Sequence, residues 1–237
     1  MSLEILKQAA WVGDQKVKGP ITGVILNFHG LGGGAEKTAP TTEEITWMQQ
    51  GALPVFPYYG PWSWLNRQSR AYVDEIVEMV YTEYKLLAST PLINIGGSMG
   101  GGSCLLYTRY AKRPVAACMA NCPVCDMKFH FNERPDLPRT IRQAFFGYEG
   151  GLDAALVEQS ALQQVEKMPM IPYLIVHGGQ DKAVSKANHG DPMVARMRQR
   201  KMNVEYIEVP DMGHCGPLPI EVVTRMIAFV SSALKKR

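Results

Sequence analysis

Ser98 stands at the centre of the segment GGSMG, residues 96–100, which matches the pattern G-x-S-x-G. An apolar run at 91–95 precedes this segment, and a helical stretch at 103–110 follows it. A serine on so tight a strand-to-helix turn needs neighbours without side chains, because the turn imposes strained backbone angles. The N–H groups at the start of the helix can stabilise developing negative charge. This context predicts that Ser98 is a nucleophile.

A serine hydroxyl is a weak nucleophile near pH 7 and needs an imidazole, oriented by a carboxylate, within hydrogen-bond reach. Of the five histidines, only His214 lies in a turn-rich loop between the last predicted strand and the last predicted helix. Asp181 follows the preceding predicted strand, so we expect it to be the acid. Asp126 and Asp211 are the alternative acids. Asp126 ranks lower because it begins an insertion, and Asp211 because it is better placed to shape the histidine loop.

Attack on an acyl group creates an oxyanion, which needs two N–H donors. Met99, directly after the serine, should supply one donor. The other should come from the glycine-rich loop HGLGGG, residues 29–34, with Leu31 as first choice and Gly32 as second. The loop fits neither G-x-x-x-x-G-K-[ST] nor G-x-G-x-x-G followed by a helix start, so a phosphate cradle is the weaker interpretation and no cofactor is expected.

Aromatic side chains gather in two segments that could line a substrate pocket. The segment at 58–64 follows a predicted strand, at the edge where α/β sheets bind ligands. The segment at 129–148 lies in a predicted insertion. The alternatives are a surface loop pinned by its own rings and ordinary core packing. The candidate pocket residues are Tyr59, Trp62, Trp64, Phe129 and Phe145.

Short apolar runs alternate with helical segments along the chain, which predicts a mostly parallel sheet with helices on both faces. We expect one α/β domain over residues 1–237, with a small cap of two helices inserted at about 122–168. A helix is expected from Thr42 to Gln50. At the start of the chain, residues 5–12 and 16–18 are expected to pair as an antiparallel edge hairpin.

Composition narrows the class of protein. Hydrophobic residues make up 46% and charged residues 20%, and the net charge of +3 is spread along the chain, so no nucleic-acid partner is expected. No stretch of about 18 apolar residues predicts a membrane span, and residues 1–13 lack a signal-peptide core, so we expect a cytoplasmic protein.

Five cysteines in a chain of this length fit a reducing compartment better than a disulfide framework. Cys122 and Cys125 have C-x-x-C spacing, and His130 is near enough in sequence to be considered as a third metal ligand. A second C-x-x-C is absent from the sequence, and Cys122 follows a predicted strand rather than beginning a helix. We therefore interpret these cysteines as packing residues and expect no metal.

The motifs together resemble the α/β-hydrolase superfamily over nearly the whole chain, through His29-Gly30, segment 96–100, Asp181 and Gly213-His214. Residues 170–184 resemble the prolyl-oligopeptidase-like and dienelactone-hydrolase-like branches, many of whose small members are esterases. The resemblance implies an α/β-hydrolase fold and a serine hydrolase. The apolar cap residues favour small or medium acyl esters, hydrolysed through an acyl-enzyme by a monomer or homodimer. The alternatives are a peptidase, a thioesterase, or a ligand-binding receptor that retains the triad.

Overall fold

A seven-stranded sheet forms the centre of the computed structural model, which describes residues 2–235. The strand order is β1-β3-β2-β4-β5-β6-β7, and β1 is antiparallel to β3 while the other neighbours are parallel. The strands are β1 (Ala10–Val12), β2 (Gly23–Phe28), β3 (Ala52–Pro57), β4 (Leu92–Gly97), β5 (Val115–Asn121), β6 (Tyr173–Gly178) and β7 (Val204–Val209).

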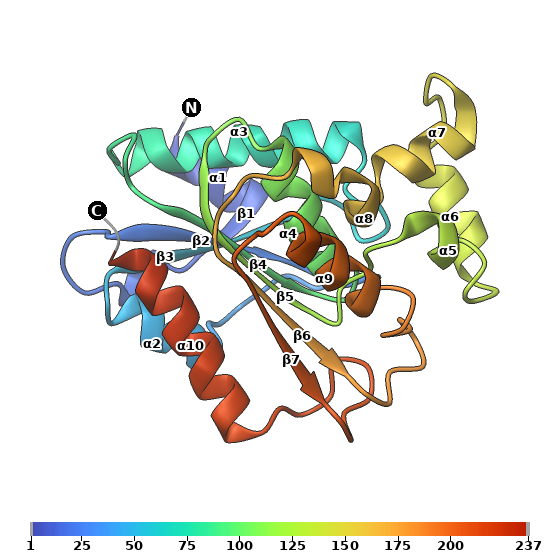
Figure 1. The fold of residues 1–237 in the computed structure, drawn as a ribbon. Coiled ribbons are helices and arrows are strands. Elements are labelled where there is room, and N and C mark those ends of the chain that lie inside the picture. Colours follow the sequence, from blue (N-terminus) through green and yellow to red (C-terminus); the bar gives the residue numbers. More distant parts are fainter. Residues whose placement is uncertain (1, 236–237) are drawn as a thin grey trace.

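Helices cover both faces of the sheet (Figure 1). One face carries α2 (Thr42–Met48) and α10 (Ile220–Leu234), which pack against each other. The opposite face carries α1 (Leu3–Ala9), α3 (Arg67–Glu83), α4 (Met99–Tyr110) and α9 (Gly190–Gln199). Successive strand residues therefore enter different cores: in β2, Val24 and Leu26 face α3 and α4, whereas Ile25 faces α2 and α10.

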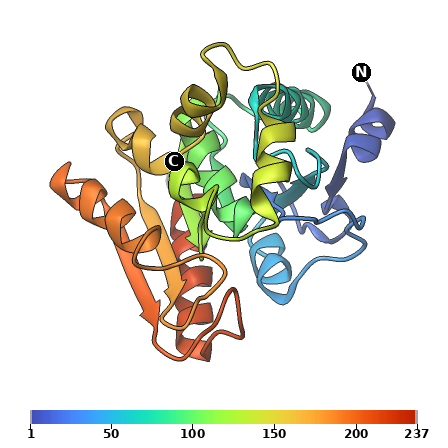
Figure 2. The same cartoon turned by 90° about the vertical axis from the view of Figure 1, so that its right-hand side faces the viewer.

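The chain between β5 and β6 forms a separate group of short helices beside the sheet, seen on the right of Figure 1 and from its own side in Figure 2. We call residues 122–172 the insertion. Its elements are α5 (Met127–His130), α6 (Leu137–Ala144), α7 (Gly151–Glu158), α8 (Ala161–Gln164) and the 3-10 turn η2 (Val165–Lys167). Leu137 and Ile141 are fully buried, so the insertion shares the core on the α3 and α4 side.

Several predicted elements are corrected by the structure. The expected N-terminal hairpin is wrong: residues 3–9 are helix α1, and residues 14–16 form a 3-10 turn, η1 (Asp14–Lys16). Only β1 remains of it, pairing with β3. The Ser2 hydroxyl caps α1, and Leu6 is the one buried residue of this helix. A single buried apolar residue is too short a pattern to distinguish a helix from a strand. The insertion contains four short helices instead of two.

The helix expected from Thr42 to Gln50 begins at Thr42, directly after its cap Thr41, and ends at Met48, two residues earlier than expected. The Thr41 hydroxyl accepts from the N–H of Glu44, and the Glu44 carboxylate accepts from the N–H of Thr41, which is a complete capping box.

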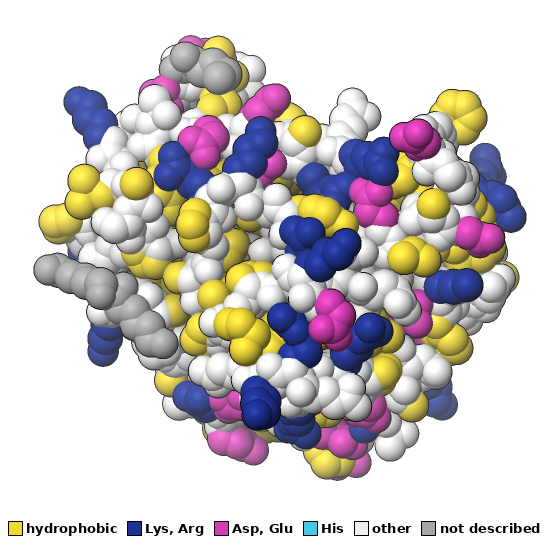
Figure 3. Space-filling view, turned by 45° about the horizontal axis from the view of Figure 1, so that its top comes forward, with side chains coloured by type: hydrophobic (Ala, Val, Ile, Leu, Met, Phe, Trp, Pro, Cys, Tyr) yellow, Lys and Arg dark blue, Asp and Glu magenta, His cyan; other side chains and the backbone are white. Residues whose placement is uncertain are grey.

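On the face drawn in Figure 3, basic and acidic side chains are interspersed rather than gathered by sign. Among residues 2–235, no helix is long and apolar enough to cross a membrane.

Candidate active site

Ser98 occupies the turn between β4 and α4 in a conformation that few side chains adopt, with φ 58° and ψ −126°. The neighbouring glycines make this turn possible. A Cβ on Gly96 would lie 2.3 Å from the carbonyl oxygen of Gly100, and a Cβ on Gly100 would lie 2.1 Å from that of Phe28. Both separations are shorter than any real contact, so the G-x-S-x-G pattern is required by close backbone packing.

The structure brings Ser98, His214 and Asp181 together. The Nε2 atom of His214 lies 2.7 Å from Ser98 Oγ, and its Nδ1 atom lies 2.7 Å from Asp181 Oδ2. Asp181 follows β6 and His214 follows β7, so both loops leave the edge of the sheet at which β4 ends. An imidazole between a hydroxyl and a carboxylate is the arrangement in which serine can lose its proton to a base.

The Asp181 side chain is fully buried and heavily hydrogen bonded. Its Oδ1 atom accepts from the N–H groups of Ala183 and Val184, each at 2.9 Å. Burial alone would raise the pKa of this carboxyl, but hydrogen bonds from His177, His214 and the Val184 N–H outweigh burial and hold the pKa well below its usual range. Asp181 is therefore a carboxylate throughout the pH range in which proteins work.

The two alternative acids lie elsewhere. Asp126 caps α5, and its Oδ1 atom accepts from the N–H groups of Lys128 and Phe129. Asp211 is exposed in the turn after β7. Of the three aspartates considered, the structure places only Asp181 in hydrogen-bond contact with His214.

His214 has an unusually basic imidazole. Burial would lower its pKa, but the hydrogen bonds and charges of Asp181 and Cys122 outweigh burial and raise the pKa to about 9. Asp181 stabilises the imidazolium. Cys122, which is buried directly after β5 and whose own pKa is lowered, adds to the effect as a thiolate. The contribution of Cys122 was not foreseen from the sequence, because 92 residues separate it from His214.

The glycine-rich loop lies beside the serine: a Cβ on Gly30 would be 3.8 Å from the Cβ of Ser98. The N–H of Gly32, the second-choice oxyanion donor, already donates to the carbonyl of Pro61 at 2.8 Å. For the backbone N–H groups of Leu31 and Met99, no acceptor is found within the described residues. Leu31 and Met99 are therefore the two candidates with N–H groups still available.

The five predicted pocket residues divide into two groups. Tyr59, Trp64 and Phe145 are buried, with 3–4% of each exposed, and they pack in the core. Tyr59 also lines a surface pocket between its own loop and α3. The Tyr59 hydroxyl donates to the carbonyl of His29 at 2.9 Å, and the centroids of the two rings are stacked 4.1 Å apart. Both contacts hold His29, the first residue of the glycine-rich loop, in place. Trp62 and Phe129 are 48% and 40% exposed. The Trp62 ring covers Gly32, where an added Cβ would meet it at 3.1 Å.

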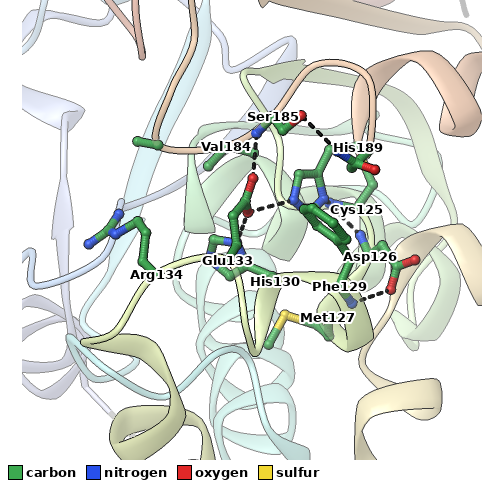
Figure 4. Close-up of polar contacts among 12 residues, drawn as sticks. Cys125, Asp126, Met127, Phe129, His130, Glu133, Arg134, Val184, Ser185 and His189 are labelled. Carbon is green, nitrogen blue, oxygen red and sulfur yellow. Dashed lines mark hydrogen bonds and ion pairs between the residues drawn. The ribbon is translucent and has the colours of Figure 1, made fainter.

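A second polar cluster joins the insertion to the loop that carries Asp181 (Figure 4). Glu133 lies at its centre: its Oε2 atom is 2.6 Å from His130 Nδ1 and 2.9 Å from His189 Nε2, and its Oε1 atom accepts from the Ser185 N–H at 2.7 Å. Burial raises the pKa of Glu133, but the two histidines and the Ser185 N–H outweigh burial and lower the pKa far below normal. No local pattern predicts this cluster, because 56 residues separate Glu133 from His189.

Glu133→Gln is expected to destabilise the fold by about 2 kcal/mol at pH 7, since it replaces charged hydrogen bonds by neutral ones and turns an amide NH₂ toward either both histidine rings or the Ser185 N–H. Urea unfolding measures this effect, with Glu149→Gln, an exposed glutamate of the insertion, as control. Because the folded-state pKa of Glu133 is depressed, the difference should shrink as the pH falls below 4.5. Equal stability of the two variants at pH 7 would contradict this role.

Comparisons with known proteins fit this geometry. Residues 72–237 match the prolyl oligopeptidase family. A search of curated proteins found no significant match. Among solved structures, a puromycin-hydrolyzing peptidase from Mycobacterium tuberculosis is 18% identical with a TM-score of 0.72, and the alignment covers 93% of this chain and 35% of that one.

Two further structures have the same fold. The Pyrococcus horikoshii acylaminoacyl peptidase is 12% identical with a TM-score of 0.79, covering 96% of this chain and 40% of that one. Est1E from Butyrivibrio proteoclasticus is 20% identical with a TM-score of 0.71, covering 96% and 94%. The chain thus spans two fifths or less of the length of the two peptidases. Likeness at these identities shows the fold, and the predicted α/β-hydrolase fold is confirmed.

Proposed function

This chain belongs to the prolyl oligopeptidase family of serine hydrolases, and from that premise we propose that Ser98, His214 and Asp181 form its catalytic triad and that its substrates are small or medium acyl esters. One observation carries the triad: the unbroken series of contacts from Asp181 through His214 to Ser98, at 2.7 Å each. An imidazole and a carboxylate in this arrangement, here His214 and Asp181, are sufficient to activate the serine hydroxyl.

In the acylation step, Ser98 Oγ attacks the ester carbonyl while its proton moves to His214 Nε2. Asp181 stabilises the imidazolium and fixes the tautomer in which Nδ1 carries a proton. The N–H groups of Leu31 and Met99 stabilise the oxyanion. The imidazolium then gives its proton to the departing alcohol, and an acyl-enzyme remains.

Water completes the reaction by the reverse path. His214 takes a proton from the water, the hydroxide attacks the acyl carbonyl, and the proton returns to Ser98 as the acid leaves. The same two N–H donors stabilise the second oxyanion. These steps use only side chains and backbone groups of the chain.

The apolar surroundings of the site favour an ester substrate. The exposed Trp62 ring covers Gly32, in the glycine-rich loop that lies beside the serine. A peptidase is the second candidate. The family supports it equally, since the family is named after a prolyl oligopeptidase. Acyl attack is common to both reactions, so substrate preference depends on the leaving group and the pocket.

A substrate panel separates the two candidates. We expect nitrophenyl esters of short and medium acyl chains to be hydrolysed with a higher kcat/KM than aminoacyl anilides, relative to the spontaneous hydrolysis of each. A fluorophosphonate should label one residue per chain, and peptide mapping should place the label on Ser98. A larger enhancement with anilides would favour the peptidase, and labelling elsewhere would remove Ser98 from its role.

The activity should depend on pH through His214, which must be neutral to accept the serine proton. Since the pKa of His214 is about 9, kcat/KM is expected to rise with pH through about pH 9. Cys122→Ser removes a group that raises this pKa, so the rise should move to lower pH. Cys125→Ala, which alters a buried cysteine of the same segment, is the control. Identical profiles for wild type and Cys122→Ser would contradict this account.

A further inference from the structure

Two cysteines lie against the candidate base. Cys122 follows β5, and Cys215 is the residue after His214. The Cys215 N–H donates to Cys122 Sγ at 3.4 Å, and Cys215 Sγ would lie 3.5 Å from a Cβ placed on Gly97, the residue before the serine. A ring nitrogen of His214 and the two sulfur atoms all lie within 4.8 Å of one another.

The backbone at both cysteines is strained. Cys122 has φ 44° and Cys215 has φ 48°, in the left-handed region that residues with a Cβ rarely adopt. Ser98, with φ 58°, is the third such residue at this edge of the sheet. Strain of this kind costs free energy and persists at sites where geometry matters. Two strained residues thus hold two thiols beside one imidazole.

The donor set suits one class of ligand. Two thiolates and an imidazole form a soft S₂N set, which prefers Zn²⁺ among the common divalent ions. His214 already has the support typical of a metal ligand, because Asp181 fixes its Nδ1–H and leaves the lone pair on Nε2.

We propose that Cys122, Cys215 and His214 form an inhibitory zinc site: a bound Zn²⁺ takes one ring nitrogen of His214, so the imidazole can no longer both contact Asp181 and accept the Ser98 proton. The inhibition, though not the binding, rests on the proposed function. With Zn–S bonds of about 2.3 Å, sulfur ligands of a tetrahedral ion lie about 3.8 Å apart, so donors within 4.8 Å need side-chain shifts of an ångström at most.

The proposed site is open to solvent on the side of Cys215. Cys215 is exposed, whereas Cys122 is fully buried, so an ion arriving from solvent meets Cys215 first. Each thiol that binds releases its proton to solvent. Three protein ligands leave the fourth position of the ion for water. Binding is therefore reversible by a chelator, as a regulatory site requires.

The cluster of His130, Glu133 and His189 fits a metal less well. In the cluster of Figure 4, the Nδ1 atom of His189 accepts from the N–H groups of Cys125 and Asp126, both at 3.1 Å. The ring proton must then lie on Nε2 and be donated to Glu133, so no lone pair on Nε2 remains for an ion. The C-x-x-C spacing is also not used, since Cys125 Sγ contacts the carbonyl of Pro123.

Metal binding is tested directly with Ser98→Ala, which cannot turn over substrate. One equivalent of Co²⁺, a spectroscopic substitute for Zn²⁺, should produce a thiolate charge-transfer band, and one equivalent of Zn²⁺ should abolish the band. Cys122→Ala and Cys215→Ala should each weaken Zn²⁺ binding by more than about 100-fold, beyond the usual cost of losing an outer-shell partner. Cys125→Ala is the matched control and should keep both the band and the affinity.

Inhibition is tested separately, with each variant compared with its own zinc-free rate. Micromolar Zn²⁺ should stop ester hydrolysis by the wild type and by Cys125→Ala, a chelator should restore it, and Cys215→Ala should resist. Absence of the charge-transfer band, or a band that survives in Cys122→Ala and Cys215→Ala, overturns the site. A protein that shows the band but has no zinc-free hydrolase activity refutes the proposed function and leaves the site standing.

Discussion

Ser98→Ala is expected to lower kcat/KM for a nitrophenyl ester by about 10⁴-fold or more, because the acyl-enzyme path is lost and only the oxyanion donors and binding remain. Fluorophosphonate labelling should disappear with it. Alanine removes only the hydroxyl from a residue at φ 58° that already carries a Cβ, so the turn between β4 and α4 should keep its shape.

Steady-state kinetics and labelling measure this effect, and thermal unfolding verifies that the fold is unchanged. Ser103→Ala is the matched control: Ser103 is the next serine along the chain, lies buried in α4, and has no hydrogen bond to His214 among the described residues. If Ser98→Ala kept a tenth of wild-type activity while remaining folded, Ser98 would not be the nucleophile.

Asp181→Asn is expected to lower kcat by about 10⁴-fold, the effect found where an amide replaces the acid of a serine triad. An amide can donate to Nδ1 and so stabilise the wrong tautomer, in which Nε2 carries the proton and cannot accept one from serine. The asparagine also leaves the imidazolium without a buried counter-charge. The pKa of His214 should fall, because its bond to Asp181 is the largest contribution that raises it.

Three variants measured together decide among the aspartates. Asp126→Asn should keep nearly full activity and lose only part of the α5 cap, a cost of at most about 1–2 kcal/mol in stability. Asp211→Asn should behave like the wild type, since its side chain is exposed. A loss of activity in either variant comparable to that of Asp181→Asn would show that the base is oriented by another acid.

Local sequence determined the frame of the site. The glycines around Ser98 predict the strained turn because only residues without a Cβ tolerate its backbone contacts, 2.1–2.3 Å from a Cβ at positions 96 and 100. The acid and the base each follow a parallel strand, so chain order alone sends them to the edge where β4 ends. The elements that were wrongly predicted are short. Helix α1 has about one turn of apolar pattern, and the four brief helices of the insertion were predicted as two.

Only the tertiary structure decided which side chains surround that frame. Cys122 contacts Cys215 from 93 residues away, and Glu133 joins His189 across 56. The Tyr59 hydroxyl donates to the carbonyl of His29 across 30 residues. Backbone turns are fixed by neighbours in sequence, whereas these contacts depend on how loops from different strands dock, which no local pattern records. The residues of the candidate triad could thus be predicted from the sequence, and the thiols beside it could not.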